Sequence, residues 1–275
     1  MNNRTGKELL QEKLPISKNS SKFLAIGFIQ LLFFIILLFI LLKITSYNWR
    51  LSIIGEIIVS FFAILPYAYV TINNEKLRRK YREKYGNLAF QKIWFRFLSY
   101  NEPLSATGLF FPFLLKTNYF LPVFIELPAC FFTRSLFNVF VAVPLSVFLI
   151  VLGSLIRRPT GGYDSDIGSY MYLIFPEDSR KLEGGLYSFI RHPNYLGRGI
   201  IALGIGVFAN NILAISLCLI HFSFFYILSL IEDWELVNRF GVDFIEYKKM
   251  VPAMIPRFRN WKIFLKMIFF DNKKT

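Results

Sequence analysis

The sequence predicts an all-α membrane protein, a polytopic bundle of about six spanning helices. Three observations support this fold class. Of 275 residues, 55% are hydrophobic and only 18% are charged, too few to coat a water-soluble globule with polar surface. Long uncharged stretches recur along the chain and match a hydrocarbon core of roughly 30 Å at about 1.5 Å of helix per residue. Basic residues gather in alternate connections between these stretches.

The first spanning helix is predicted over residues 23–42, which are twenty consecutive uncharged positions between Lys22 and Lys43. A secretory signal would have a shorter apolar run followed by a small-residue cleavage site. Here Thr45 and Ser46 follow a long run without an A-x-A pattern. We therefore expect this segment to be retained as an anchor.

The other spans are predicted from the apolar stretches 51–72, 106–132, 135–156 and 199–231. The last has 33 uncharged residues, enough for a hairpin of two helices that turns at Asn210-Asn211, which gives six spans in all. The stretch 106–132 is the least regular, and a broken or re-entrant segment is the alternative there. It contains Lys116, Glu126, Pro112, Pro122 and Pro128.

The distribution of basic residues predicts the topology. A net charge of +14 is compatible with nucleic-acid binding, but 28 of the 32 Lys and Arg residues fall into four segments, 1–22, 75–100, 157–198 and 232–275. The connections at 43–50 and 133–134 hold three, and the turn at 209–211 holds none. This alternation favours cytosolic anchoring and contact with membrane lipids over nucleic acid. Both termini are therefore predicted to be cytosolic.

Cysteine and histidine usage predicts neither a disulfide framework nor a metal site. Cys130 and Cys218 both lie in predicted spans, and with His192 and His221 they match no familiar metal-ligand spacing. For His221, near the middle of a span, a hydrogen bond between helices is favoured over a functional role.

Two carboxylates within predicted spans, Glu56 and Glu126, are functional candidates because charged groups are costly in hydrocarbon. They rank below the C-terminal polar cluster, since no residue near them in sequence complements them. The chain thus divides into an N-terminal membrane-spanning region, 1–156, and a C-terminal region, 157–275, where chemistry is expected. In the second region we expect a loop with a short strand or interfacial stretch at 170–175, and an interfacial amphipathic helix over 257–275.

The densest polar sequence surrounds Arg191 and His192 and precedes the predicted hairpin. A helix that begins at Pro193 rises about 24 Å to the turn and returns about 20 residues later, so Arg191 and His192 should meet Glu232 and Asp233 at one membrane face. Such a site fits a zwitterionic ligand, with the cations on a carboxylate or phosphate and the carboxylates on an ammonium or ribose hydroxyls. Contact with lipid headgroups is the alternative.

The segment 191–197, Arg-His-Pro-Asn-Tyr-Leu-Gly, resembles the RHPxYxG motif of the isoprenylcysteine carboxyl methyltransferase and phospholipid methyltransferase families. Downstream of this motif, the families have the pattern EE, FG, Y, Y, VP and IP. This chain has a similar series, Glu232-Asp233, Phe240-Gly241, Phe244, Tyr247, Val251-Pro252 and Ile255-Pro256. The resemblance covers residues 184–258. Two departures are Asp233 in place of a second Glu, and Phe244 where Tyr is common.

The resemblance implies an S-adenosylmethionine site at the cytosolic membrane face, open laterally to a lipid-like or prenylated acceptor in the bilayer. The residues that it places around the cofactor are Arg191, His192, Pro193, Tyr195, Gly197 and Glu232, with Asp233 as their support. Tyr187 is also expected to bind the cofactor. Arg239 is a further expected neighbour. Glu232 and Arg191 are the predicted catalytic residues, with Glu232 as the base that an amine acceptor would need. Methyl transfer otherwise requires mainly alignment and exclusion of water, because the sulfonium methyl is already electrophilic.

Two other function classes remain open from the sequence. An NADPH-dependent reductase of the sterol or steroid type is the alternative enzyme, because those proteins have a similar C-terminal architecture and His192-Pro-Asn-Tyr195 resembles their cofactor loop. A non-enzymatic transporter or assembly factor would need polar residues repeated along several spans. The spans contain few of them.

Overall fold

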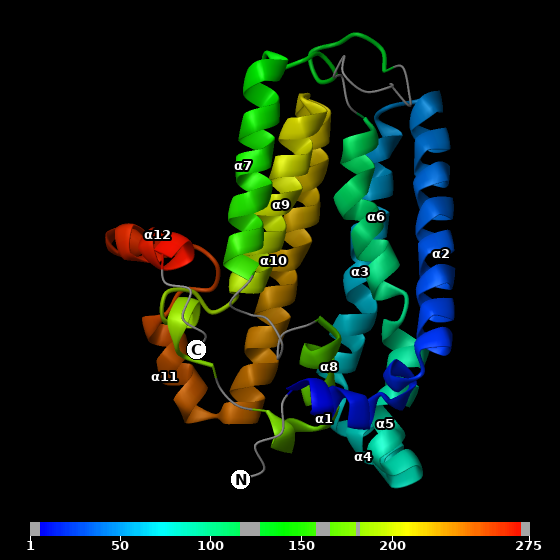
Figure 1. The fold of residues 1–275 in the computed structure, drawn as a ribbon, viewed down its shortest axis with the longest axis vertical. Coiled ribbons are helices and arrows are strands. Elements are labelled where there is room, and N and C mark those ends of the chain that lie inside the picture. Colours follow the sequence, from blue (N-terminus) through cyan, green and yellow to red (C-terminus); the bar gives the residue numbers. More distant parts are fainter. Residues whose placement is uncertain (1–5, 116–126, 158–165, 180–181, 271–275) are drawn as a thin grey trace.

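The computed structural model describes residues 6–115, 127–157, 166–179 and 182–270. Every regular element in these ranges is a helix, which confirms the all-α class (Figure 1). The α-helices of the described ranges are α1 (Gly6–Lys13), α2 (Ser20–Tyr47), α3 (Leu51–Ile72), α4 (Asn74–Tyr85), α5 (Ala89–Ile93), α6 (Asn101–Leu114), α7 (Val139–Arg157), α8 (Asp166–Ile174), α9 (Pro193–Ala209), α10 (Ile212–Phe240), α11 (Val242–Met250) and α12 (Trp261–Phe270).

Four helices of the described ranges, α2, α3, α7 and α10, are long and apolar enough to cross a membrane. Helix α9 has 17 residues and packs along both α7 and α10. The count of six spans and the cytosolic placement of both termini remain predictions.

The span predicted over 106–132 is not continuous. Helix α6 begins at Asn101 and ends at Leu114, two residues after Pro112. Residues 116–126, with Glu126, lie outside the described ranges, and a turn held by Thr133 follows. Pro128 lies in the non-helical residues before this turn, and its carbonyl oxygen accepts a hydrogen bond from Thr133 Oγ1.

The bundle has two groups of helices that meet at α10. Helices α2, α3 and α6 form one group, and α7, α9 and α10 form the other (Figure 1). Helix α10 also packs against α3 and α6, so it joins both groups. Leu213 and Leu217 of α10 are buried with Val59 of α3 and Phe111 of α6 in a shared apolar core. Any cavity between the groups is therefore lined from both halves of the chain.

Glycines bring α7 and α9 into backbone contact. A Cβ built on Gly197 would lie 2.5 Å from Arg157 Cγ and 2.6 Å from the carbonyl oxygen of Gly153. About two turns further along the interface, Ser146 Oγ donates to the carbonyl oxygen of Gly204 over 2.8 Å. Small residues allow this approach, which is a common way to pack helices in membranes.

Two asparagines form the turn between α9 and α10. Asn210 has φ of 61°, a left-handed conformation that Asn tolerates well, and its side chain pairs with the backbone of Phe137. Asn211 accepts a hydrogen bond from the Ala214 N–H over 2.8 Å and so caps the first turn of α10. The chain therefore reverses, and the start of α9 and the end of α10 lie at the same end of the bundle (Figure 1).

The strand considered for residues 170–175 is wrong. Residues 170–174 form the second half of helix α8, whose Met171, Leu173 and Ile174 are buried in a core with α4 and α5. Tertiary burial of one face decides helix over strand here, because a short apolar run fits either element by its pattern. At the C-terminus, residues 261–270 form α12, which is helical as predicted, and its interfacial position remains a prediction.

Candidate active site

The loop before α9 is fixed by the C-terminal tail. The backbone N–H of Arg191 donates to the Pro252 carbonyl over 2.9 Å, and that of His192 donates to the Ala253 carbonyl over 2.9 Å. Nearby, the Tyr247 hydroxyl donates to the Tyr187 carbonyl over 2.6 Å. The two motifs that the sequence places about 60 residues apart are therefore neighbours in the structure, and the tail sets the position of the loop.

Asp233 is the centre of a buried ionic network. Its side chain is 1% exposed and accepts hydrogen bonds from Arg191 Nε at 3.0 Å and Nη2 at 2.5 Å. His192 Nε2 lies 2.9 Å from its Oδ1, and Lys248 Nζ lies 3.3 Å from its Oδ2. Because every lone-pair direction has a partner, Asp233 orients its neighbours and has little capacity to bind a ligand.

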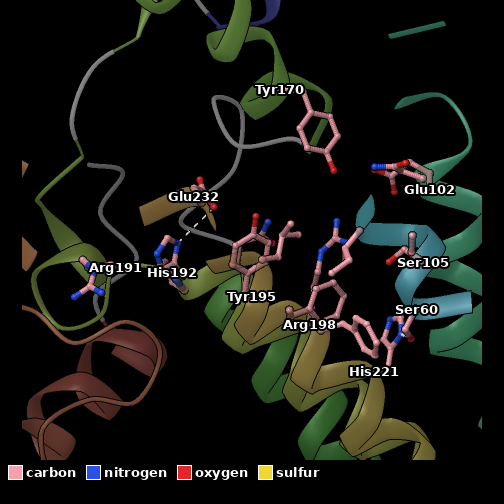
Figure 2. Close-up of a pocket in the computed structure, with 18 of the residues that line it drawn as sticks. Ser60, Glu102, Ser105, Tyr170, Arg191, His192, Tyr195, Arg198, His221 and Glu232 are labelled. Atoms are coloured by element: carbon pink, nitrogen blue, oxygen red, sulfur yellow. Dashed lines mark hydrogen bonds and ion pairs between the residues drawn. The ribbon is translucent and has the colours of Figure 1, made fainter. Parts of the chain in front are cut away.

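Arg191 is held by the same network. Its Nη1 donates to the carbonyl oxygens of Lys248 and Val251, while Nε and Nη2 bind Asp233. In Figure 2 its guanidinium lies apart from Tyr195 and Arg198. The geometry therefore gives Arg191 a positioning role, and it offers no support for the predicted catalytic role.

His192 connects the two adjacent carboxylates Glu232 and Asp233 of α10. Its Nε2 contacts Asp233, and its Nδ1 lies 3.5 Å from Glu232 Oε2. Burial alone would lower the pKa of His192, but the hydrogen bonds to Asp233 and Glu232 outweigh it and raise this pKa above the ordinary 6.5. The imidazolium form thus has a partner for each N–H.

Glu232 differs from Asp233 although the two are adjacent. Its side chain is 25% exposed, compared with 1% for Asp233. It lines the pocket of the site together with His192 and Tyr195 (Figure 2). Successive residues of a helix point about 100° apart, so only one of two neighbours can face a given cavity. Glu232 is the carboxylate available to a ligand.

The pocket extends from Glu232 and His192 into the helix bundle, and it encloses about 90 Å³. Tyr195 stacks on His192 with ring centroids 5.6 Å apart and on Phe225 at 6.0 Å, forming one aromatic wall. The N-terminal half of the chain also contributes to the lining. The polar residues that the sequence did not single out are Ser60, Asn101, Glu102, Ser105, Tyr170 and Arg198. Of these, Arg198 could have been recognised from the sequence, because it is a charged residue directly before the apolar stretch 199–231.

The predicted site residues thus separate into two groups. Six of them line the pocket: Tyr187, Arg191, His192, Pro193, Tyr195 and Glu232. Asp233 does not line the pocket and instead contacts His192 Nε2. Gly197 instead faces α7, where it allows close packing, so we place it outside the pocket. Arg239 binds Glu235 over 2.6 Å and borders a different hollow.

Comparison with known proteins confirms the family resemblance. The profile of the phospholipid methyltransferase family matches residues 141–243, which is less than half of the chain. The chain is 34% identical over 80 residues to a protein-S-isoprenylcysteine O-methyltransferase of Homo sapiens, covering 29% of this chain and 28% of that protein. The corresponding protein of Schizosaccharomyces pombe is 35% identical over 81 residues, covering 29% and 34%.

A protein-S-isoprenylcysteine O-methyltransferase B of Arabidopsis thaliana is 30% identical over 110 residues, covering 39% of this chain and 56% of that protein. The matches therefore span about a quarter to just over half of the relatives' length. No solved structure matches the chain.

Proposed function

We propose that this protein is a methyltransferase that uses S-adenosylmethionine to methylate a lipid-like or prenylated acceptor from the bilayer. The observation that supports it best is the pocket at Glu232 and His192. Both residues lie in the segment that matches the phospholipid methyltransferase family, and the reported relatives are named O-methyltransferases. The chemistry of the lining residues is consistent with this cofactor.

The side chains at the mouth of the pocket suit a cationic, zwitterionic cofactor. Glu232 supplies a partly exposed carboxylate for an ammonium group or ribose hydroxyls, and Tyr195 supplies an aromatic face. An enclosed volume of about 90 Å³ is below the roughly 300–1,000 Å³ of typical ligand pockets. Binding the whole cofactor therefore requires lining side chains to move.

The bound cofactor supplies an electrophilic methyl group on a positively charged sulfur. The chain's own residues then position and shield the reactants. Arg191 and Asp233 fix the ring of His192, and His192 in turn orients Glu232. Tyr195 and Phe225 line the pocket toward the bundle interior, where they would exclude water from the reacting groups.

Replacing Glu232 with Gln is expected to weaken binding of S-adenosylmethionine by about 1–3 kcal/mol, because it removes a charged hydrogen-bond acceptor while nearly keeping the shape. His192→Ala should weaken it as well, since Glu232 loses its orienting partner. Calorimetry in detergent measures both. Glu246→Gln is the control, because its side chain is 58% exposed and pairs only with Lys249 on the surface of α11. Unchanged affinity in Glu232→Gln and His192→Ala would leave the cofactor assignment without its residues.

The acceptor is proposed to reach the pocket from the bilayer with its apolar body among the helices. The pocket lies between α3 and α6 on one side and α9 and α10 on the other, all of them rich in apolar residues. Each buried CH₂ contributes about 0.8 kcal/mol to membrane binding, so acceptors with shorter chains should lose activity steeply in reconstituted vesicles. The measurement is the rate of methyl transfer along a homologous series of the labelled lipid. If a water-soluble head-group analogue reacted as fast as the full-length lipid, lateral access would be wrong.

A further inference from the structure

Three polar side chains meet inside the bundle, at the end of the pocket away from Glu232. Ser60 Oγ of α3 donates to Glu56 Oε1 over 2.8 Å and lies 2.8 Å from Nδ1 of His221 on α10. The same Nδ1 lies 3.2 Å from Glu56 Oε1. Glu56 and Ser60 are 0% exposed and His221 is 2% exposed. The sequence analysis ranked Glu56 below the C-terminal cluster, and for His221 it favoured a hydrogen bond between helices over a functional role.

The cluster has hydrogen-bonding capacity left over. Among the described residues, Glu56 Oε2 and His221 Nε2 are buried without a partner. Most buried polar atoms in proteins are paired, and a buried carboxylate and imidazole in apolar surroundings are costly, so the exceptions point to function.

Helix α6 closes one side of the cluster with its backbone. A Cβ on Gly108 of α6 would lie 2.5 Å from His221 Nδ1 and 2.7 Å from Glu56 Oε1, so no side chain fits there. The open side is the pocket, which Ser60 and His221 both line (Figure 2). A ligand group in the pocket can therefore reach the cluster.

The contacts of His221 favour one arrangement of its protons. With Glu56 ionised, the Nδ1–H of His221 is shared between Ser60 Oγ and Glu56 Oε1, and Nε2 keeps a lone pair. A carboxylate that fixes the tautomer of a histidine prepares the other ring nitrogen to accept a proton. Charged groups from other helices, Glu102 of α6 and Arg198 of α9, line the same pocket.

The distance along α10 separates this cluster from the proposed cofactor end. His221 and Glu232 are eleven positions apart in α10, which corresponds to roughly 16 Å of helix. The two ends of one pocket can therefore hold different reactants, with the donor at Glu232 and the acceptor head toward His221.

We propose that the cluster of Glu56, Ser60 and His221 receives the reacting head of the acceptor and that His221 Nε2 takes its proton. The inference rests on the proposed function. The acceptor is then a nucleophile that carries hydrogen, an amine or a hydroxyl, rather than a carboxylate. Its lone pair forms the new bond to the methyl carbon as the sulfur–carbon bond breaks, the bonding electrons leave on a neutral thioether, and the proton passes to Nε2. A carboxylate has no proton to give at neutral pH.

The test uses the full chain in vesicles made from the total lipid of the expression host, with S-adenosylmethionine labelled in its methyl group. Mild alkali releases methanol from methyl esters and leaves N-methyl and ether products intact. We expect alkali-stable label from the wild type. His221→Gln should lower kcat at least about 100-fold, which is typical of a lost general base. The dissociation constant of the His221→Gln variant for S-adenosylmethionine should stay within about twofold of the wild-type value. Loss of a general base acts on the chemical step rather than on cofactor binding.

The pH profile separates a base from a structural residue. The dependence of kcat on pH should differ between the wild type and His221→Gln, because the variant lacks the group proposed to take the proton. Ser60→Ala is the second variant, because it keeps the ring and removes one contact of Nδ1; a loss of about tenfold is expected, less than that of a whole general base. If His221→Gln no longer binds the cofactor, the rate of Ser60→Ala tests the inference in its place.

Three results would contradict this inference. Alkali-labile label would identify a carboxylate acceptor, and an unchanged rate and pH profile in both variants would remove His221 from the reaction. If the wild type bound the cofactor but transferred no label to any lipid, the proposed function itself would fail, and the inference with it.

Discussion

Asp233→Asn is expected to lower the free energy of unfolding by about 3–5 kcal/mol. The Asp233 side chain is 1% exposed and Arg191, its bidentate partner, is 7% exposed, so removing the carboxylate charge leaves a buried guanidinium without compensation. His192 and Lys248 lose the same partner. For a chain of this size each kcal/mol corresponds to roughly 2–4 °C in the unfolding midpoint, so the shift should be easy to resolve in detergent.

The matched control for Asp233 is an exposed ion pair. Arg82 Nη2 and Glu177 Oε1 lie 2.8 Å apart with side chains 39% and 49% exposed, and Glu177→Gln should change stability by less than about 1 kcal/mol. Arg191→Gln combined with Asp233→Asn should cost less than the sum of the two single changes, because they remove one shared interaction. Additive effects, or an Asp233→Asn midpoint equal to the wild type, would show that this network does not hold the loop before α9.

Gly197→Val is expected to destabilise the protein by about 1–3 kcal/mol or more, because it overpacks the contact of α7 with α9. Even a Cβ would lie 2.6 Å from the carbonyl oxygen of Gly153, and a backbone atom cannot turn aside as a flexible side chain can. The helices must separate, which also disturbs the loop that carries His192. We therefore expect weaker cofactor binding together with a lower unfolding midpoint.

Gly27→Ala is the control for this prediction. Gly27 lies in α2, and a Cβ there would meet nothing within 4 Å. Alanine is a better helix former than glycine by roughly 0.5–1 kcal/mol, so this change should be neutral or slightly stabilising. Were Gly197→Val as well tolerated as Gly27→Ala, close contact between α7 and α9 would not be needed.

The sequence by itself determined the helical membrane class and the family resemblance. Both depend on local features, since uncharged stretches of about 20 residues have few other solutions and the motif at 191–197 is contiguous. It also indicated His192 and Glu232, because chain length along two helices sets which residues return to the same end. The assignment of these residues to a cofactor remains a prediction.

Only the tertiary structure decided the direction in which each side chain points. Arg191 turns to the C-terminal tail, and Asp233 is enclosed while its neighbour Glu232 faces the pocket. Gly197 of the motif faces another helix instead of a ligand. Rotation about a helix axis and the choice of neighbours depend on packing, which the motif does not encode.

The cluster of Glu56, Ser60 and His221 shows this limit most clearly. Ser60 lies one helical turn from Glu56, but Ser60 and His221 are 161 positions apart, and no residue close to His221 in sequence suggests a partner. Their contact exists because α10 packs on α3, and because Gly108 of α6 lets a third helix approach them. A buried polar group acquires its partners from the fold, so the sequence could mark Glu56 and His221 as unusual, while the packing of three helices brought them together.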